Sequence, residues 1–143
     1  ACALQDVGLG AEGSAEHGCF TYISAADAEE LATRVGTSER SVQRIGEAIR
    51  LHMDLTVDRG AGADAYLLHA AAHFDVAGRR APEIPRATVD ATIAEYPRTG
   101  FTDAFAQSMR REVELRPNSR AATLWRSGMA LPLRTNPLDW KSR

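Results

Sequence analysis

Three side chains, Asp6, His52 and Asp75, stand where a carboxylate or an imidazole could do chemistry. Apolar residues at helical spacing lead up to Ile49, and His52 comes three residues later on the same helix face. We therefore expect His52 to point toward the core. Asp75 falls on one edge of the most apolar segment of the chain, and a buried carboxylate needs hydrogen bonds, a cation or a metal. Carboxylates and imidazole bind divalent metals such as zinc, and imidazole can also transfer protons near neutral pH. Together these residues predict a metal-dependent or acid–base site.

Each of the three also has a purely structural interpretation. Asp6 precedes a glycine-rich loop and could simply accept hydrogen bonds from loop amides. His52 could be a hydrogen-bonded core histidine, and Asp75 could pair with a buried arginine such as Arg50 or Arg79. Their combined order along the chain is what favours a site.

Two further histidines, His69 and His73, lie one helical turn apart and could line a pocket. Histidines four apart can also bind zinc together, but no glutamate follows His69, as the His-Glu-x-x-His motif requires. His17, in the glycine-rich loop, could reach the opening of a site or be solvated.

The elements that must position these residues are predicted to be helical. Apolar residues recur every three or four positions, alternating β-branched runs are scarce, and glycine or proline separates the segments. We therefore expect an all-α single domain over residues 1–130, followed by an extended tail over 131–143. The expected helices are 1–7, 25–35, one capped by Thr37 or Ser38 that reaches His52, 63–77, 85–96, one capped by Thr102 and closed by Pro117, and 119–129.

Composition narrows the class of protein. The chain has 143 residues, enough for one core, with 44% hydrophobic and 25% charged residues. A net charge of −2 without a basic cluster argues against nucleic acid as a partner. No apolar run reaches the length of a bilayer span and no secretory signal is visible, so we expect a cytoplasmic protein without membrane contact, with Cys2 and Cys19 as free thiols.

Five segments together resemble a known family. Residues 3–9 read Ala-Leu-Gln-Asp-Val-Gly-Leu, which is similar to the motif in which HD-superfamily metal-dependent hydrolases carry a His-Asp pair before an apolar residue and a glycine. Gln5 takes the place of the histidine. The other segments follow the pattern of the branch that includes cyanamide hydratases, and the likeness extends over residues 1–78. These segments are 20–28, 48–52, 67–70 and 74–78.

The resemblance implies an HD-type helical bundle, here without its N-terminal helix, that holds a divalent metal such as zinc, iron or manganese. Asp6 and Asp75 match two ligands and His52 matches a residue at the reacting centre, while the family's upstream histidine has no counterpart. A metal of this kind activates water, and the branch favours a small nitrile-like or amide-like substrate. The predicted function is therefore a metal-dependent hydrolase or hydratase.

Gln5 weakens that prediction, since an amide oxygen is a poor ligand for zinc or iron compared with imidazole. Three alternatives follow: an impaired enzyme, a non-catalytic binding or interaction domain that has lost its metal site, or an ordinary enzyme in which Gln5 is an engineered replacement. The sequence indicates a small-molecule substrate but no oligomeric state.

Overall fold

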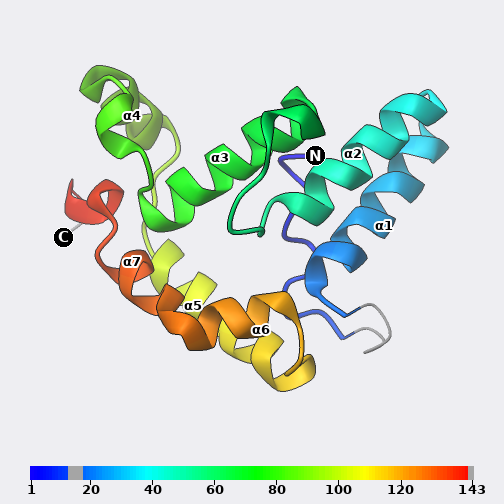
Figure 1. Ribbon diagram of the computed structural model, residues 1–143. Helices are drawn as coiled ribbons and strands as arrows, with labels where there is room; N and C mark the ends of the chain where they lie inside the picture. The colour runs from blue at the N-terminus through cyan, green and yellow to red at the C-terminus, as the bar shows by residue number, and fades with distance from the viewer. Residues whose placement is uncertain (13–17, 142–143) are drawn as a thin grey trace.

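The computed structural model describes residues 1–12 and 18–141, and every regular element in that part of the chain is a helix (Figure 1). The all-α prediction is confirmed. The main helices are α1 (Phe20–Arg34), α2 (Glu39–Leu51), α3 (Ala63–Ala77), α4 (Arg86–Glu95), α5 (Phe101–Leu115), α6 (Arg120–Leu124) and α7 (Ala130–Arg134). The short ones are the 3₁₀ turns η2 (Arg59–Ala61), η3 (Ala81–Glu83) and η5 (Pro137–Lys141), and the π-helical turn η4 (Trp125–Met129).

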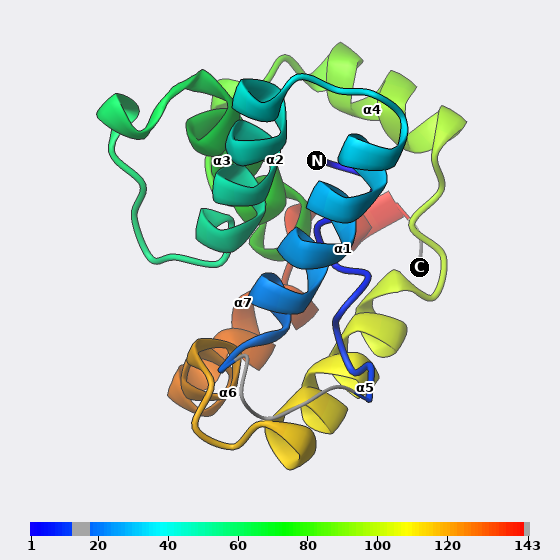
Figure 2. The same cartoon turned by 90° about the vertical axis from the view of Figure 1, so that its right-hand side faces the viewer.

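The main helices form two groups. α1 packs on α2 and α2 on α3, while α5 packs on α6 and α7, and α7 also contacts α3 (Figures 1 and 2). One apolar cluster fills the first group, and a second joins the start of α1 and the end of α3 to the second group. α4 stands apart at one end and buries no residue. None of the described helices is both long and apolar enough to cross a bilayer.

Local capping signals fix several helix ends as predicted. Ser38 caps α2 by accepting a hydrogen bond from the Ser41 amide. Gly36, with φ +79°, ends α1 in the left-handed conformation that glycine adopts without strain. α3 has the predicted bounds and ends at the left-handed Gly78. These ends depend on residues within one turn of the helix, so the sequence predicts them well.

α1 begins five residues before its predicted start, at Phe20 rather than Ala25. The Phe20 amide donates to Oε1 of Glu112, 3.1 Å away on α5, which satisfies a donor that the first helical turn leaves free. The start of α5 also differs from the prediction. Its N-cap is Gly100, and the hydroxyl of Thr102, the predicted cap, donates instead to Asp139. In both places the deciding partner lies far away in the sequence.

The predicted helix over residues 1–7 is wrong. Residues 2–10 form successive turns, closed by amide-to-carbonyl hydrogen bonds between residues three apart. An isolated run of seven residues is too short to repay the cost of starting a helix, and this run packs on α1 instead.

Gly8 anchors these turns to α1. Its amide donates to Ser24 Oγ at 3.0 Å, and its carbonyl oxygen accepts from Arg116 at 3.2 Å. A β-carbon on residue 8 would lie 2.8 Å from the carbonyl oxygen of Phe20, so only glycine allows this approach. The segment is therefore positioned by tertiary contacts.

The extended tail predicted for residues 131–143 is also wrong for its described part. Residues 130–134 form α7, and a 3₁₀ turn begins at Pro137. Leu133, Asn136 and Leu138 are buried. The prolines that suggested an extended chain lie in first turns of helices, where no amide hydrogen is needed.

Candidate functional site

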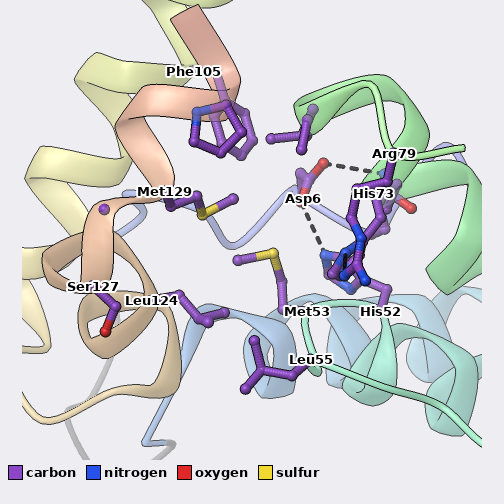
Figure 3. A pocket seen from close by; sticks show the side chains of 16 residues that line it. Asp6, His52, Met53, Leu55, His73, Arg79, Phe105, Leu124, Ser127 and Met129 are labelled. Atoms are coloured by element: carbon purple, nitrogen blue, oxygen red, sulfur yellow. Dashed lines mark hydrogen bonds and ion pairs between the residues drawn. The ribbon is translucent and has the colours of Figure 1, made fainter. Parts of the chain in front are cut away.

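A cavity of about 290 Å³ lies where the end of α2, the second half of α3, the start of α5 and the η4 turn meet (Figure 3). It is lined by four of the side chains that the sequence selected, Gln5, Asp6, His52 and His73. His69 and Asp75 do not line it, and His17 lies outside the described residues. The sequence therefore predicted residues that lie on one side of this cavity.

The opposite side of the cavity is mainly apolar, apart from Ser127, and the sequence did not predict it as part of the site. Phe105, Leu124 and Met129 face Met53 across the cavity (Figure 3), and Val76 adds to the lining from α3. These residues fall at ordinary core positions of their helices, and the same cluster holds fully buried neighbours. Sequence periodicity marks them as inward-facing and gives no sign that a cavity lies beside them.

His52 is buried, with only 1% of its surface exposed, and its two ring nitrogens differ in role. Nδ1 lies 2.6 Å from the carbonyl oxygen of Ile49. Because a carbonyl only accepts, Nδ1 must carry the proton, and Nε2 of a neutral ring is an acceptor. Nε2 lies 3.3 Å from Oδ1 of Asp6 but has no hydrogen-bond partner among the described residues. With a neutral ring, Nε2 and the carboxylate are two adjacent acceptors, whereas a protonated ring would donate to Asp6 as an ion pair.

Gln5 and Asp6 form the rest of the polar side. The amide Nε2 of Gln5 donates to Oδ2 of Asp6 at 3.3 Å. A carboxylate accepts only, so the amide must turn its NH₂ toward Asp6 and its oxygen away. That oxygen, Oε1, is buried and has no partner in the described part of the chain. The Asp6 side chain is 39% exposed, so its carboxylate stays accessible.

Asp75 does not point into the core, contrary to the prediction. Its side chain is 51% exposed, and its carboxylate pairs with Arg98, a residue of the loop before α5, rather than with Arg50 or Arg79. The pKa of Asp75 is raised above its usual value, mainly because the side chain is partly buried. Arg98 opposes this effect by lowering the pKa, and the charges of Asp139 and Asp6 add to the rise. Asp6 and Asp75 are thus close enough for their charges to interact, yet Arg98 already neutralises Asp75.

His69 and His73 stack with their ring centroids 4.2 Å apart. Nε2 of His69 lies 2.9 Å from the carbonyl oxygen of Asp54, which fixes it as a donor. Nδ1 of His73 lies 3.0 Å from Nη1 of Arg79, so it must accept, and this requires a neutral ring. Burial, followed by the charges of His69, Arg79 and His52, lowers the pKa of His73 to about 4. Each ring already has a partner, so the structure gives no support to a zinc pair.

The low pKa of His73 predicts a pH-dependent stability. His73 stays neutral in the folded protein down to about pH 4, but in the unfolded chain a histidine takes up a proton near pH 6.5. Its contribution to the free energy of unfolding is therefore complete above about pH 6.5. That contribution is lost as the pH falls toward 4, and we expect a loss of about 1–3 kcal/mol after allowance for partial exposure. Urea unfolding gives the free energy of unfolding of the wild type and of His73→Gln between these pH values. The contribution of His73 is the difference between the two slopes of that free energy against pH. A His73 resonance that titrates near 6.5 in NMR spectra would contradict the prediction.

The residues around Asp6 do not fit the metal that the family resemblance implies. In the described part of the chain, no group of three or more His, Cys, Asp and Glu side chains is placed to hold an ion. Gln5 presents its NH₂ rather than its oxygen to Asp6, and Asp75 is held by Arg98. What remains is His52 beside Asp6, too few ligands for a transition metal.

Comparison with known proteins adds no family. No protein-family model matches the chain, and no curated protein matches it.

Proposed function

We propose that this chain is a small-molecule-binding domain, the non-catalytic alternative among the sequence predictions. What supports it is a cavity of about 290 Å³ that has a mainly apolar lining and a polar side at Gln5, Asp6 and His52. Ligand pockets in proteins combine mostly apolar lining with a few polar groups that orient the ligand. A cavity of this size suits a small ligand, with its apolar body against Met53, Phe105 and Met129 and its polar end at Asp6.

The observation that carries this proposal is Nε2 of His52, which has no hydrogen-bond partner when the ring is neutral. Leaving a buried polar atom without a hydrogen bond costs about 1–3 kcal/mol, and buried polar atoms in folded proteins are almost always bonded. His52 lines the cavity, and its Nε2 is buried beside the more exposed carboxylate of Asp6. A ligand with a donor group repays that cost on binding to the neutral ring, and protonation of the ring, which would pair it with Asp6, is the other way to repay it.

The second candidate is the metal-dependent hydrolase or hydratase implied by the family resemblance. One observation favours it: the Ile49 carbonyl holds Nδ1 of His52, which leaves Nε2 at the cavity, as a general base requires. Metal analysis separates the candidates. Stoichiometric metal in the purified chain favours the enzyme. Metal bound by the Gln5→His variant alone favours an enzyme whose metal site is disabled by Gln5.

Binding of hexan-1-ol, followed by ¹H–¹⁵N NMR, tests the proposed function. We expect saturable shifts at Met53, Val76 and Phe105, because the six-carbon chain replaces empty space against apolar side chains. Met129→Trp should abolish them, since Met129 points into the cavity and indole fills more of it.

Leu131→Trp is the matched control, because Leu131 lies nearby in the sequence but is exposed and does not line the cavity. Unchanged hexanol binding in Met129→Trp would place the probe elsewhere and overturn the assignment of this cavity.

A further inference from the structure

At Gln5, Asp6 and His52, the polar side of the cavity offers more free acceptors than free donors. Nε2 of neutral His52 and Oε1 of Gln5 lack partners, and the carboxylate of Asp6 accepts only. Of the donors of the same three residues, Nδ1 of His52 is used by the Ile49 carbonyl, and one of the two N–H groups of the Gln5 amide is used by Asp6. A ligand that satisfies this set must therefore bring several hydrogens of its own.

The charge at this side of the cavity points the same way. Asp6 is the acid that lines the cavity, and the basic residue that does so, Arg79, directs Nη1 to the ring of His73. The neighbours of Asp6 for which contacts are described are an amide and an imidazole, neither of which is a permanent cation. A cationic group on the ligand would therefore meet an accessible carboxylate on a largely apolar surface, where charge-assisted hydrogen bonds are strong.

From these contacts we propose that the cavity binds a small organic cation that carries a primary ammonium group on an apolar body, an inference that rests on the proposed function. The ammonium has three N–H donors for Asp6, His52 and Gln5. It also supplies the donor missing between Nε2 of His52 and the carboxylate of Asp6, 3.3 Å apart. The apolar body occupies the space beside Met53 and Met129.

Other polar groups satisfy the site less well. A hydroxyl brings one donor for three acceptors. A carboxylate brings none and meets the charge of Asp6, so it could bind only through Arg79. A bare divalent ion needs at least three ligands, which the described residues do not supply here.

The test compares three probes with the same six-carbon chain: hexan-1-amine, hexan-1-ol and hexanoate. Dissociation constants are measured by NMR titration at low ionic strength and about pH 8, above the usual titration range of histidine. We expect the amine to bind about tenfold or more tightly than the alcohol, and hexanoate to bind most weakly. Asp6→Asn should remove about tenfold of the amine's affinity and lower that of hexanol much less, since the variant keeps the shape and loses the charge.

Asp27→Asn is the matched control, because Asp27 is exposed on α1 and outside the cavity; its amine affinity should stay at the wild-type value. Gln5→Met, which removes the Oε1 acceptor at similar length, provides an independent measurement if Asp6→Asn does not fold, and should weaken the amine several-fold.

The outcomes separate the two proposals. Hexanol or hexanoate binding as tightly as the amine, or amine affinity that neither variant lowers, overturns the ammonium assignment and leaves the binding function standing. Failure of all three probes to shift the residues that line the cavity overturns the proposed function itself.

Discussion

Replacing Glu112 with alanine is expected to lower the free energy of unfolding by about 3–5 kcal/mol. Glu112, on α5, and Arg116, the residue that follows α5, are both buried and form an ion pair. Nε of Arg116 donates to Oε1 of Glu112 at 2.8 Å. Removing the carboxylate leaves the guanidinium buried without a counter-charge, which costs far more than the loss of an exposed pair.

The effect should extend beyond α5, because this pair also holds two other parts of the chain. Glu112 accepts from the amide of Phe20 at the start of α1. Arg116 donates to the carbonyl oxygens of Gly8 and Ala11, at 3.2 Å each, in the turns that carry the Gln5–Asp6 pair. We therefore expect Glu112→Ala to shift the amide resonances of residues 5–11 as well as to destabilise the fold.

Urea unfolding measures the loss, with Glu114→Ala as the matched control. Glu114 lies on the same helix but is exposed, so its truncation should cost no more than about 0.5 kcal/mol. Glu112→Gln should fall between the two, since it keeps an acceptor for Phe20 and removes the charge. Equal losses in the Glu112 and Glu114 variants would show that the buried pair does not stabilise the fold.

How far the sequence predicts the fold depends on where each deciding contact lies. Gly36, Ser38 and Gly78 act on their own helix ends, and those ends match the prediction. Glu112, by contrast, sits next to Arg116 at an ordinary i, i+4 spacing that usually marks a solvated pair. Nothing local shows that it caps a helix 92 residues away, so the start of α1 could not be predicted.

The same reasoning applies to the site. The helical spacing from Ile49 predicts that His52 is buried, and the structure agrees. The apolar character of α3 predicts that Asp75 points inward. Only one face of that helix is buried, however, and Asp75 lies at the edge of this face, where it pairs with Arg98. Whether an acid on such an edge meets a metal or an arginine depends on a loop 23 residues later. Periodicity cannot settle that choice.

The second large effect is expected at Leu133, in the segment for which an extended surface tail was predicted. Leu133 is fully buried in the cluster that joins the two helical groups. Its truncation to alanine should lower the free energy of unfolding by about 2–5 kcal/mol, the cost of the lost apolar burial plus the cavity left behind. Urea unfolding at neutral pH measures it.

Leu131 supplies the control, because it lies two residues earlier on the same helical turn with 69% of its surface exposed. Leu131→Ala should change the stability by no more than about 0.5 kcal/mol. A surface tail predicts small and similar effects at both positions, whereas a helix that closes the core predicts a large effect at Leu133 alone. Because η4 and α7 also border the cavity, through Met129 and Pro132, a core role for Leu133 means that the C-terminal segment helps to shape the binding site.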